Sequence, residues 1–337
     1  MSIEEVILKR QIFFNNNWST EKEVNTEALH LCQKRMDENK LNQLLVPIIV
    51  EENEAFSTFT KDKELAKIFS AYLDVFHFLP LHPDLAFDNI WRTLEYTIKL
   101  YAKRVWNYGA DKGTVDCFKR VAAEVIEPMV NKEKSLGRTY VALFNNMSVS
   151  LSNYITIRLL YTKQLSIAPQ VAFVQERAEQ ILPDGLLNII RNAYSKKDGT
   201  MDAKNVRDIG RRLARLIKGK DFEFGGNKYN SLEFADRVHF LLSVVLYTSR
   251  CERFHGDIYS PFKSSISSLN RYYEYYYLTL CSLLFFWTII SKLVEYDKNL
   301  TPFFDFGLLT YFKPYSSPFF SVPHLQKLIK NLGCSFL

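Results

Sequence analysis

Glycine and proline are scarce in this sequence, with 12 and 11 residues in a chain of 337. A fold made of many short strands needs these residues at its turns, so their scarcity favours helices. Aromatic residues, in contrast, make up 15% of the chain, and hydrophobic residues make up 47%. A chain of this length can bury a large, aromatic-rich core in one large domain or two ordinary ones. We therefore expect an all-α fold.

Cysteine is also sparse. The five cysteines are widely spaced, and no CxxC pair occurs. This distribution is typical of reduced thiols and not of a disulfide framework or a zinc site. The first residues, MSIEE, are charged, and the N-terminal stretch lacks the apolar core and cleavage site of a signal peptide. These features predict a cytoplasmic protein. The net charge of +6 permits an anionic partner without requiring one.

Motifs that mark several common enzyme classes are missing. The sequence contains no GxxxxGK[ST], GxGxxG or GxSxG, and it has neither HExxH nor a pair of histidines at metal-binding spacing. These absences argue against an NTPase, a dinucleotide-dependent enzyme, a serine hydrolase and a zinc enzyme. We therefore expect no cofactor and no metal ion.

One long segment has no charged residue. Residues 275–291, YYYLTLCSLLFFWTIIS, reach the lower limit of length for a helix that spans a membrane. Charged side chains lie close on both sides, at Glu274, Lys292 and Glu295. We interpret the segment as a fully buried core helix and expect no membrane association. A membrane-associated effector is the alternative.

Apolar residues at three- and four-residue steps predict a series of helices. The clearest lies in residues 79–109, where Pro83 and Asp84 give a start signal. The stretch FEFGGNKYN, residues 222–230, predicts a turn or a small hairpin. Asn230 and Glu233 resemble a capping box at the start of the helix that follows. The other expected helices cover residues 138–162, two segments on either side of Pro183, and residues 202–220, 230–255, 265–296 and 323–332.

Three regions follow from this pattern. Residues 1 to about 60 have an irregular helical pattern, and we expect residues 1–75 to form an N-terminal helical extension. Residues 76–298 hold the strong helical elements of the main domain. Residues 299–337 are aromatic and interrupted by prolines, which predicts a tail packed on the core.

A basic stripe runs along residues 202–220. Arg207, Arg211 and Arg215 recur at four-residue steps, and Lys204 and Lys218 extend the stripe. A solvated polar face is the simpler interpretation. A face that binds the phosphates of RNA is the functional alternative.

The stretch YTSRCERFHGDIYSPF, residues 247–262, places Arg250 and His255 where a helix is expected to end. The unpaired carbonyls of a helix C-terminus favour cations and help a histidine to become protonated near neutral pH. Such a histidine can transfer protons, and a neighbouring arginine can bind a phosphate. The pair suits cleavage of RNA by its own 2′-hydroxyl, a reaction that needs no metal ion.

Two short motifs give the chain a resemblance to the HEPN superfamily, all-helical proteins found in many RNases of bacterial defence and toxin systems. The family has an arginine and a histidine in R-x4-6-H near a helix end, and the sequence here reads RCERFHG from Arg250 to Gly256. An earlier helix often reads F-x-x-x-W-x-x-L-E, which matches Phe87, Trp91, Leu94 and Glu95. The two motifs stand about 150 residues apart. The resemblance therefore implies a HEPN-like antiparallel helical bundle with extra N-terminal and inserted helices.

The resemblance also implies a function. Arg250 and His255 would be the catalytic residues of a metal-independent endoribonuclease. Glu95 is a weaker supporting candidate, for which an ordinary surface carboxylate is the alternative. Beside this pair, Arg253 could bind a neighbouring phosphate, and a surface charge pair with Glu252 is the alternative. RNA would be the substrate, and an antitoxin or another protein of a defence system would be a partner. Five residues separate Arg250 from His255 by about 140° on an ideal helix, and HEPN proteins commonly dimerise so that two motifs share one cleft. We therefore expect a homodimer.

A second hypothesis comes from a different class of protein. Family members usually have a polar residue after the motif arginine, whereas this chain has Cys251. Together with the long insertion, this departure favours a HEPN-like module that binds RNA or protein without cutting RNA.

Overall fold

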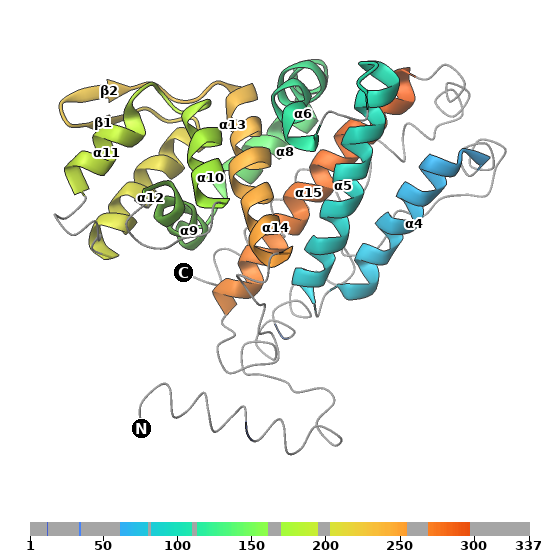
Figure 1. Ribbon diagram of the computed structural model, residues 1–337, viewed down its shortest axis with the longest axis horizontal. Coiled ribbons are helices and arrows are strands. Elements are labelled where there is room, and N and C mark those ends of the chain that lie inside the picture. The colour runs from blue at the N-terminus through green and yellow to red at the C-terminus, as the bar shows by residue number, and fades with distance from the viewer. Residues whose placement is uncertain are drawn as a thin grey trace.

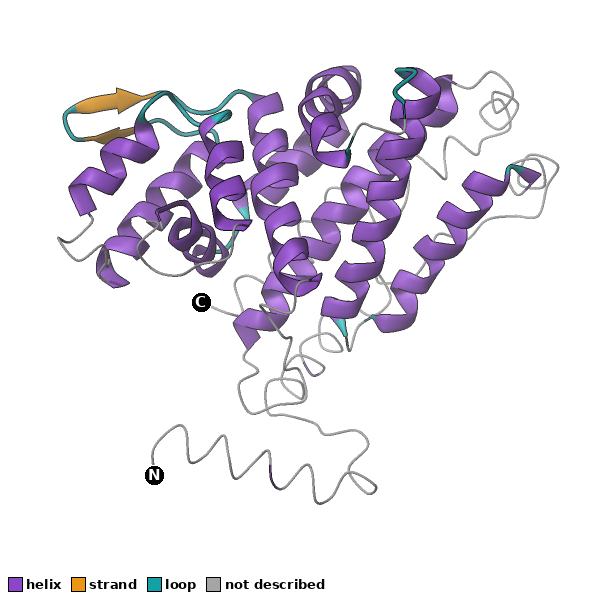
Figure 2. Ribbon diagram, in the orientation of Figure 1, coloured by secondary structure: helices purple, strands orange, loops and turns teal. Residues whose placement is uncertain are grey.

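The computed structural model of the protein is mostly helical (Figures 1 and 2), as the composition predicts. Figure 2 shows a single small hairpin among the helices of the described chain. The structure describes residues 61–79, 82–109, 113–160, 170–194, 203–254 and 269–296, together with the single residues Ile12 and Lys34.

The helices are α4 (Lys63–Phe78), α5 (Pro83–Val105), α6 (Thr114–Arg120), α7 (Glu127–Lys132), α8 (Lys134–Asn145), α9 (Val149–Leu160), α10 (Gln170–Glu179), α11 (Leu186–Tyr194), α12 (Ala203–Ile217), α13 (Phe234–Phe240), α14 (Tyr247–Phe254) and α15 (Leu269–Tyr296). Two π-helical segments, η2 (Val121–Ile126) and η3 (Leu241–Leu246), join α6 to α7 and α13 to α14. The strands β1 (Phe222–Phe224) and β2 (Asn227–Tyr229) form an antiparallel hairpin.

The first group of helices is α4, α5 and α15, which lie together on one side of the molecule (Figure 1). The apolar residues of α5 that predicted a helix are fully buried there, including Phe87, Trp91 and Leu94. On α4, the ring of Tyr72 stacks on Phe286 of α15, with ring centroids 5.4 Å apart. Burial of such large aromatic side chains is the main stabilising contribution of this group.

Helix directions in this group differ from a simple antiparallel bundle. The Thr279 hydroxyl donates a hydrogen bond to the carbonyl of Pro83 at the start of α5, and Tyr296 lies near Tyr101 toward the other end. Helices α5 and α15 therefore run in the same direction. Helix α4 runs the opposite way, because its first turn meets the last turn of α5 through the ion pair between Asp62 and Arg104.

The expected limit between residues 75 and 76 falls inside α4. Leu65 and Ile68 of this helix are buried in the same core as α5 and α15. The main domain therefore includes residues from Leu65 onward. The expected tail over residues 299–337, with its short helix at 323–332, lies outside the described residues.

The second group is α9 to α12 with the hairpin, on the other side of the molecule (Figure 1). Helix α12 packs closely on α9 because Gly210 has no side chain at the contact. A Cβ atom there would lie 3.3 Å from the backbone nitrogen of Asn153 and closer still to its side-chain oxygen. The predicted turn in FEFGGNKYN is confirmed, and Gly225 and Gly226 both adopt the positive φ values that this tight turn requires.

The helix α13–η3–α14 lies between the two groups (Figure 1). It begins at Phe234, preceded by Glu233, and no side chain caps its first turn. The capping box expected at Asn230 is therefore wrong. Its middle segment, η3, is a π-helix in which all six residues are buried.

The break between α8 and α9 differs from the expectation. The helix expected over residues 138–162 is divided into α8 and α9, because the Ser148 hydroxyl accepts the backbone N–H of Leu151 and starts a new helix.

The π-segment η2 stands just before Pro128, the second residue of α7. Proline donates no backbone hydrogen bond and crowds the preceding turn, which the wider π-turn relieves.

Candidate functional site

Helix α14 is the polar end of the long helix α13–η3–α14. Buried aliphatic residues fill η3, and the charged residues Arg250, Glu252 and Arg253 follow within α14. Successive residues of a helix point about 100° apart, so Arg250 and Arg253 reach α5 at different places, whereas Glu252 reaches α9. Each neighbour gives its residue a different environment.

Arg253 is held by two carboxylates of α5. Its guanidinium donates a 2.7 Å hydrogen bond to Asp88 and lies 3.4 Å from Asp84, and its side chain is only 10% exposed. The hydroxyl of Tyr275 on α15 accepts a further bond at 3.3 Å. Burial opposes the charge of Arg253, but Asp88 and Tyr275 together outweigh it and raise the pKa of Arg253 above its usual value. Arg253 therefore anchors α14 to α5 and α15.

Glu252 makes an equivalent connection to α9. Its carboxylate accepts hydrogen bonds from the Arg158 guanidinium and from the Tyr154 hydroxyl. The Glu252 and Arg158 side chains are 11% and 18% exposed. Burial, assisted by the charge of Glu252, raises the pKa of Tyr154 well above its usual value. The phenol therefore stays neutral and donates to the carboxylate.

Arg250 is the least engaged of the three. Its guanidinium lies 3.5 Å from the carboxylate of Glu95 on α5, and its side chain is 24% exposed. The guanidinium carbon lies 4.4 Å from the centre of the Phe254 ring, and that side chain is 40% exposed. The Nε atom of Arg250 is buried and has no hydrogen-bond partner in the described part of the chain. Of the α14 charges, Arg250 is therefore the one available to a ligand.

The two segments that carry the predicted motifs meet at this point. Glu95 contacts Arg250, and the ring centres of Trp91 and Tyr247 lie 6.1 Å apart. The structure thus brings together Arg250, Glu95 and Arg253 from the predicted set. Arg253, however, is neutralised by Asp84 and Asp88, so its guanidinium is occupied.

His255 lies outside the described residues, as does Gly256, and α14 is described as far as Phe254. The relation between His255 and Arg250 therefore stays a prediction of the sequence.

Arg177 of α10 is a residue that the sequence did not single out. Its Nε donates a 2.9 Å hydrogen bond to the carbonyl of Ser243, and its guanidinium lies 4.9 Å from the centre of the Tyr247 ring. Ser243 is part of η3, whose π-helical hydrogen bonds pair the backbone carbonyls differently from those of an α-helix. Burial lowers the pKa of Arg177. No spacing in the sequence connects Arg177 with η3, because the contact arises from tertiary packing.

Arg207, Arg211 and Arg215 lie elsewhere, on α12. We call these three residues the α12 face. All three are exposed, and α12 belongs to the group on the other side of the molecule from α5 (Figure 1). Arg215 donates to the backbone carbonyl of Asp221, whereas Arg207 and Arg211 form no ion pair with any residue that the structure describes. The structure does not bring this face together with Arg250.

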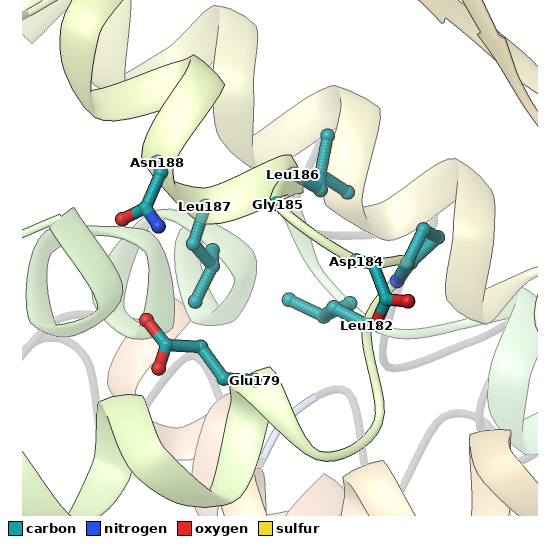
Figure 3. Close-up of a pocket in the computed structure, with 8 residues that line it drawn as sticks. Glu179, Leu182, Asp184, Gly185, Leu186, Leu187 and Asn188 are labelled. Carbon is teal, nitrogen blue, oxygen red and sulfur yellow. The ribbon is translucent and has the colours of Figure 1, made fainter.

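A small pocket of about 220 Å³ lies at the turn between α10 and α11 (Figure 3). Its lining includes Glu179, Asp184 and Asn188, and none of the predicted site residues. Arg191 forms a 3.2 Å ion pair with Glu179 and donates a hydrogen bond to the side chain of Asn188. The pocket is separate from the α14 site. Over the ranges that the structure describes, no group of His, Cys, Asp and Glu side chains is arranged to hold a metal ion.

Among the described helices, one segment, Tyr272–Leu293 within α15, is long and apolar enough to cross a membrane. Its most apolar window is 94% buried within the protein. Such burial is typical of a core helix, as the sequence predicted.

Comparisons with protein families, with curated proteins and with solved structures found no match to this chain.

Proposed function

We propose that the protein is a metal-independent endoribonuclease of the HEPN type. The observation that carries this proposal is the contact between Glu95 and Arg250. These residues belong to the two motifs of the resemblance, which are far apart in the sequence. Their proximity supports the interpretation that both motifs serve one site.

The chemistry follows from the properties of the side chains. Arg250 binds the scissile phosphate and stabilises the negative charge that grows on its oxygens during the reaction. His255 removes the proton from the 2′-hydroxyl, which attacks the phosphate and expels the 5′-oxygen of the next nucleotide. The leaving oxygen takes a proton from water, and His255 returns to water the proton that it removed. The products are a 2′,3′-cyclic phosphate and a 5′-hydroxyl. Glu95 orients the guanidinium of Arg250 before RNA binds.

The remaining features of the proposal concern the cellular setting. The protein acts in the cytoplasm as a homodimer, in which Arg250 and His255 of both copies line a shared cleft. It is an effector or toxin of a bacterial defence system, restrained by an antitoxin or another partner protein. Sedimentation at micromolar concentration tests the dimer, and a strict monomer would contradict it.

Cleavage of a defined RNA tests the proposal directly. The purified full chain is incubated with labelled single-stranded RNA in the presence of EDTA, beside the variants Arg250→Ala and His255→Ala. Each variant should lose most of the activity, roughly 100-fold or more. Arg138→Ala is the control, because Arg138 is exposed on α8 and should leave cleavage unchanged.

The ends of the products give a second criterion. Fragments should carry a 2′,3′-cyclic phosphate and a 5′-hydroxyl. Ends with a 3′-hydroxyl and a 5′-phosphate would contradict the mechanism. Activity that survives in both variants would show that the site is wrong.

A non-catalytic module that binds RNA or a protein is the second candidate. Cys251 follows the motif arginine, and Glu95 already compensates part of the charge of Arg250. Both features suit a site that holds a ligand without reacting. This alternative predicts RNA or protein binding that depends on Arg250, together with intact RNA after long incubation.

A further inference from the structure

A basic and aromatic surface runs along α5, beginning beside the candidate site. Arg92, Tyr96, Lys99 and Lys103 are all exposed. With 100° between successive residues, the four lie within about 60° of the helix circumference. We call these four residues the α5 face.

The α5 face is continuous with Arg250. The guanidinium carbon of Arg92 lies 4.8 Å from the centre of the Phe254 ring, and that of Arg250 lies 4.4 Å from the same centre. Arg92 and Arg250 therefore contact one ring, and the distance between their guanidinium carbons cannot exceed the sum of these two distances. A cation over an aromatic ring is held in place without losing its charge.

No residue that the structure describes forms an ion pair with the basic residues of the α5 face. Glu95, the acidic residue of α5 nearest to Arg92 in the sequence, pairs with Arg250, and Asp88 pairs with Arg253. Arg92, Lys99 and Lys103 form no ion pair with another described residue. A strand of phosphates could therefore meet these charges without displacing an ion-pair partner that the structure describes.

The shape of the face selects a class of polyanion. Arg92 and Lys103 are separated by about 16 Å along the helix axis, which is the length of a few nucleotides. Tyr96 lies between them with its side chain 38% exposed. An exposed aromatic ring among cations is the arrangement by which proteins hold single-stranded nucleic acid, because a base stacks on the ring while phosphates meet the charges.

We infer that the α5 face holds a single strand of RNA that leads away from the phosphate at Arg250. Arg92, Lys99 and Lys103 bind backbone phosphates, and Tyr96 stacks on a base. The inference rests on the proposed function in one respect only: it takes the strand held by α5 to be the strand that is cleaved.

Binding of an uncleavable strand tests the inference. The probe is a fluorescein-labelled 2′-O-methyl oligouridine of about 12 nucleotides, which has no free 2′-hydroxyl to attack the phosphate. Its fluorescence anisotropy is measured with the full chain at several salt concentrations. The main variant is Arg92→Gln/Lys99→Gln/Lys103→Gln. The control, Lys67→Gln/Lys134→Gln/Arg138→Gln, removes the same charge from exposed residues of α4 and α8.

The main variant should bind about tenfold more weakly or worse at low salt. The plot of log affinity against log salt should become shallower by about 2, because each lost phosphate contact contributes about 0.7. The control should retain the slope of the wild type. Equal slopes for the two triple variants would overturn the inference, and so would a wild type that does not bind the probe.

Stacking has its own test. Tyr96→Ala should weaken binding by about tenfold without changing the salt slope, and Tyr96→Phe should bind nearly as the wild type does. Equal binding by the alanine variant and the wild type would contradict a role for the ring.

The two proposals fail in different ways. If Arg250→Ala and His255→Ala cut RNA as the wild type does but the α5 variant binds weakly, the nuclease site is wrong and the RNA track stands. If those two variants abolish cleavage but the α5 variant cuts RNA with an unchanged KM, the nuclease proposal stands and the track is wrong.

Discussion

The protein presents two basic helix faces of different construction, the α5 face and the α12 face. On α12, three exposed arginines follow one another at four-residue steps. On α5, the basic residues lie on both sides of Tyr96, and Arg92 contacts the ring of Phe254 beside Arg250. Of the two faces, only the α5 face lies beside the candidate site at Arg250. The comparison teaches that a regular charge repeat is weaker evidence of binding than charges placed beside aromatic rings and a second helix.

The largest expected effect separates the anchoring arginine from the exposed ones. Arg253→Ala leaves the buried Asp84 and the partly buried Asp88 without their cation, which should lower the free energy of unfolding by about 3 to 5 kcal/mol. Arg92→Ala on the α5 face should change it by less than about 0.5 kcal/mol. Urea denaturation measures both. Equal effects would mean that the α5 face is also part of the structural core.

A pH effect should act on the helix that lies between the two faces. Burial, with a smaller contribution from Lys119, lowers the pKa of His239 on α13 to about 4. The unfolded chain therefore binds this proton more readily, and stability should be lost as the pH falls from about 6.5 to 4. The loss due to His239 should be about 3 kcal/mol.

Denaturation at pH 7 and pH 4.5 measures this effect in the wild type and in His239→Gln. The variant should lose less stability than the wild type over this interval, because its side chain has no proton to bind. A variant with the same pH dependence would show that other groups control the acid response.

The attachment of α12 gives a smaller effect. In Gly210→Ala, the new methyl group meets Asn153 of α9, so stability should fall by about 1 to 2 kcal/mol despite the higher helix propensity of alanine. Gly137→Ala is the matched control. Its methyl group meets the side chain of Val130 at 3.1 Å, and that side chain can move. A thermal melt that ranks the two the other way would contradict the close packing of α12 on α9.

The smallest effect belongs to the α12 face itself. Arg207→Gln/Arg211→Gln/Arg215→Gln should change affinity for the oligouridine probe by less than about threefold, because screened charges far from the bound strand contribute little. A larger loss than that of the α5 variant would reverse the comparison. The RNA track would then lie on α12, which is the functional alternative that the sequence left open for this charge repeat.

Local structure was the most predictable part of the molecule. Helix α5 and the hairpin follow from the spacing of apolar residues and from two adjacent glycines, which are local signals. The division between α8 and α9 was missed because a single hydroxyl, that of Ser148, decides it. Helix directions were also missed, because α5 and α15 run parallel and no local pattern specifies that arrangement.

The site was predictable only in part. The motif identified Arg250 and Glu95, and the structure brings these two residues into contact. The sequence also offered Arg253 as a ligand for a neighbouring phosphate, but in the fold its guanidinium is bound by Asp84 and Asp88. Two arginines three residues apart look alike in a sequence. Their partners come from α5, and only tertiary packing determines which of the two is buried.

The π-helical segment η3 determines the direction in which the side chains of α14 point around the helix axis. Removing one residue from this segment would rotate everything after it by about 100° and draw it back by about 1.5 Å. Glu252 would then turn away from Arg158, and Arg250 from Glu95. The number of residues in η3 thus sets the angular position of α14 against its neighbours. A single-residue deletion there would disable the site without altering any residue that forms it.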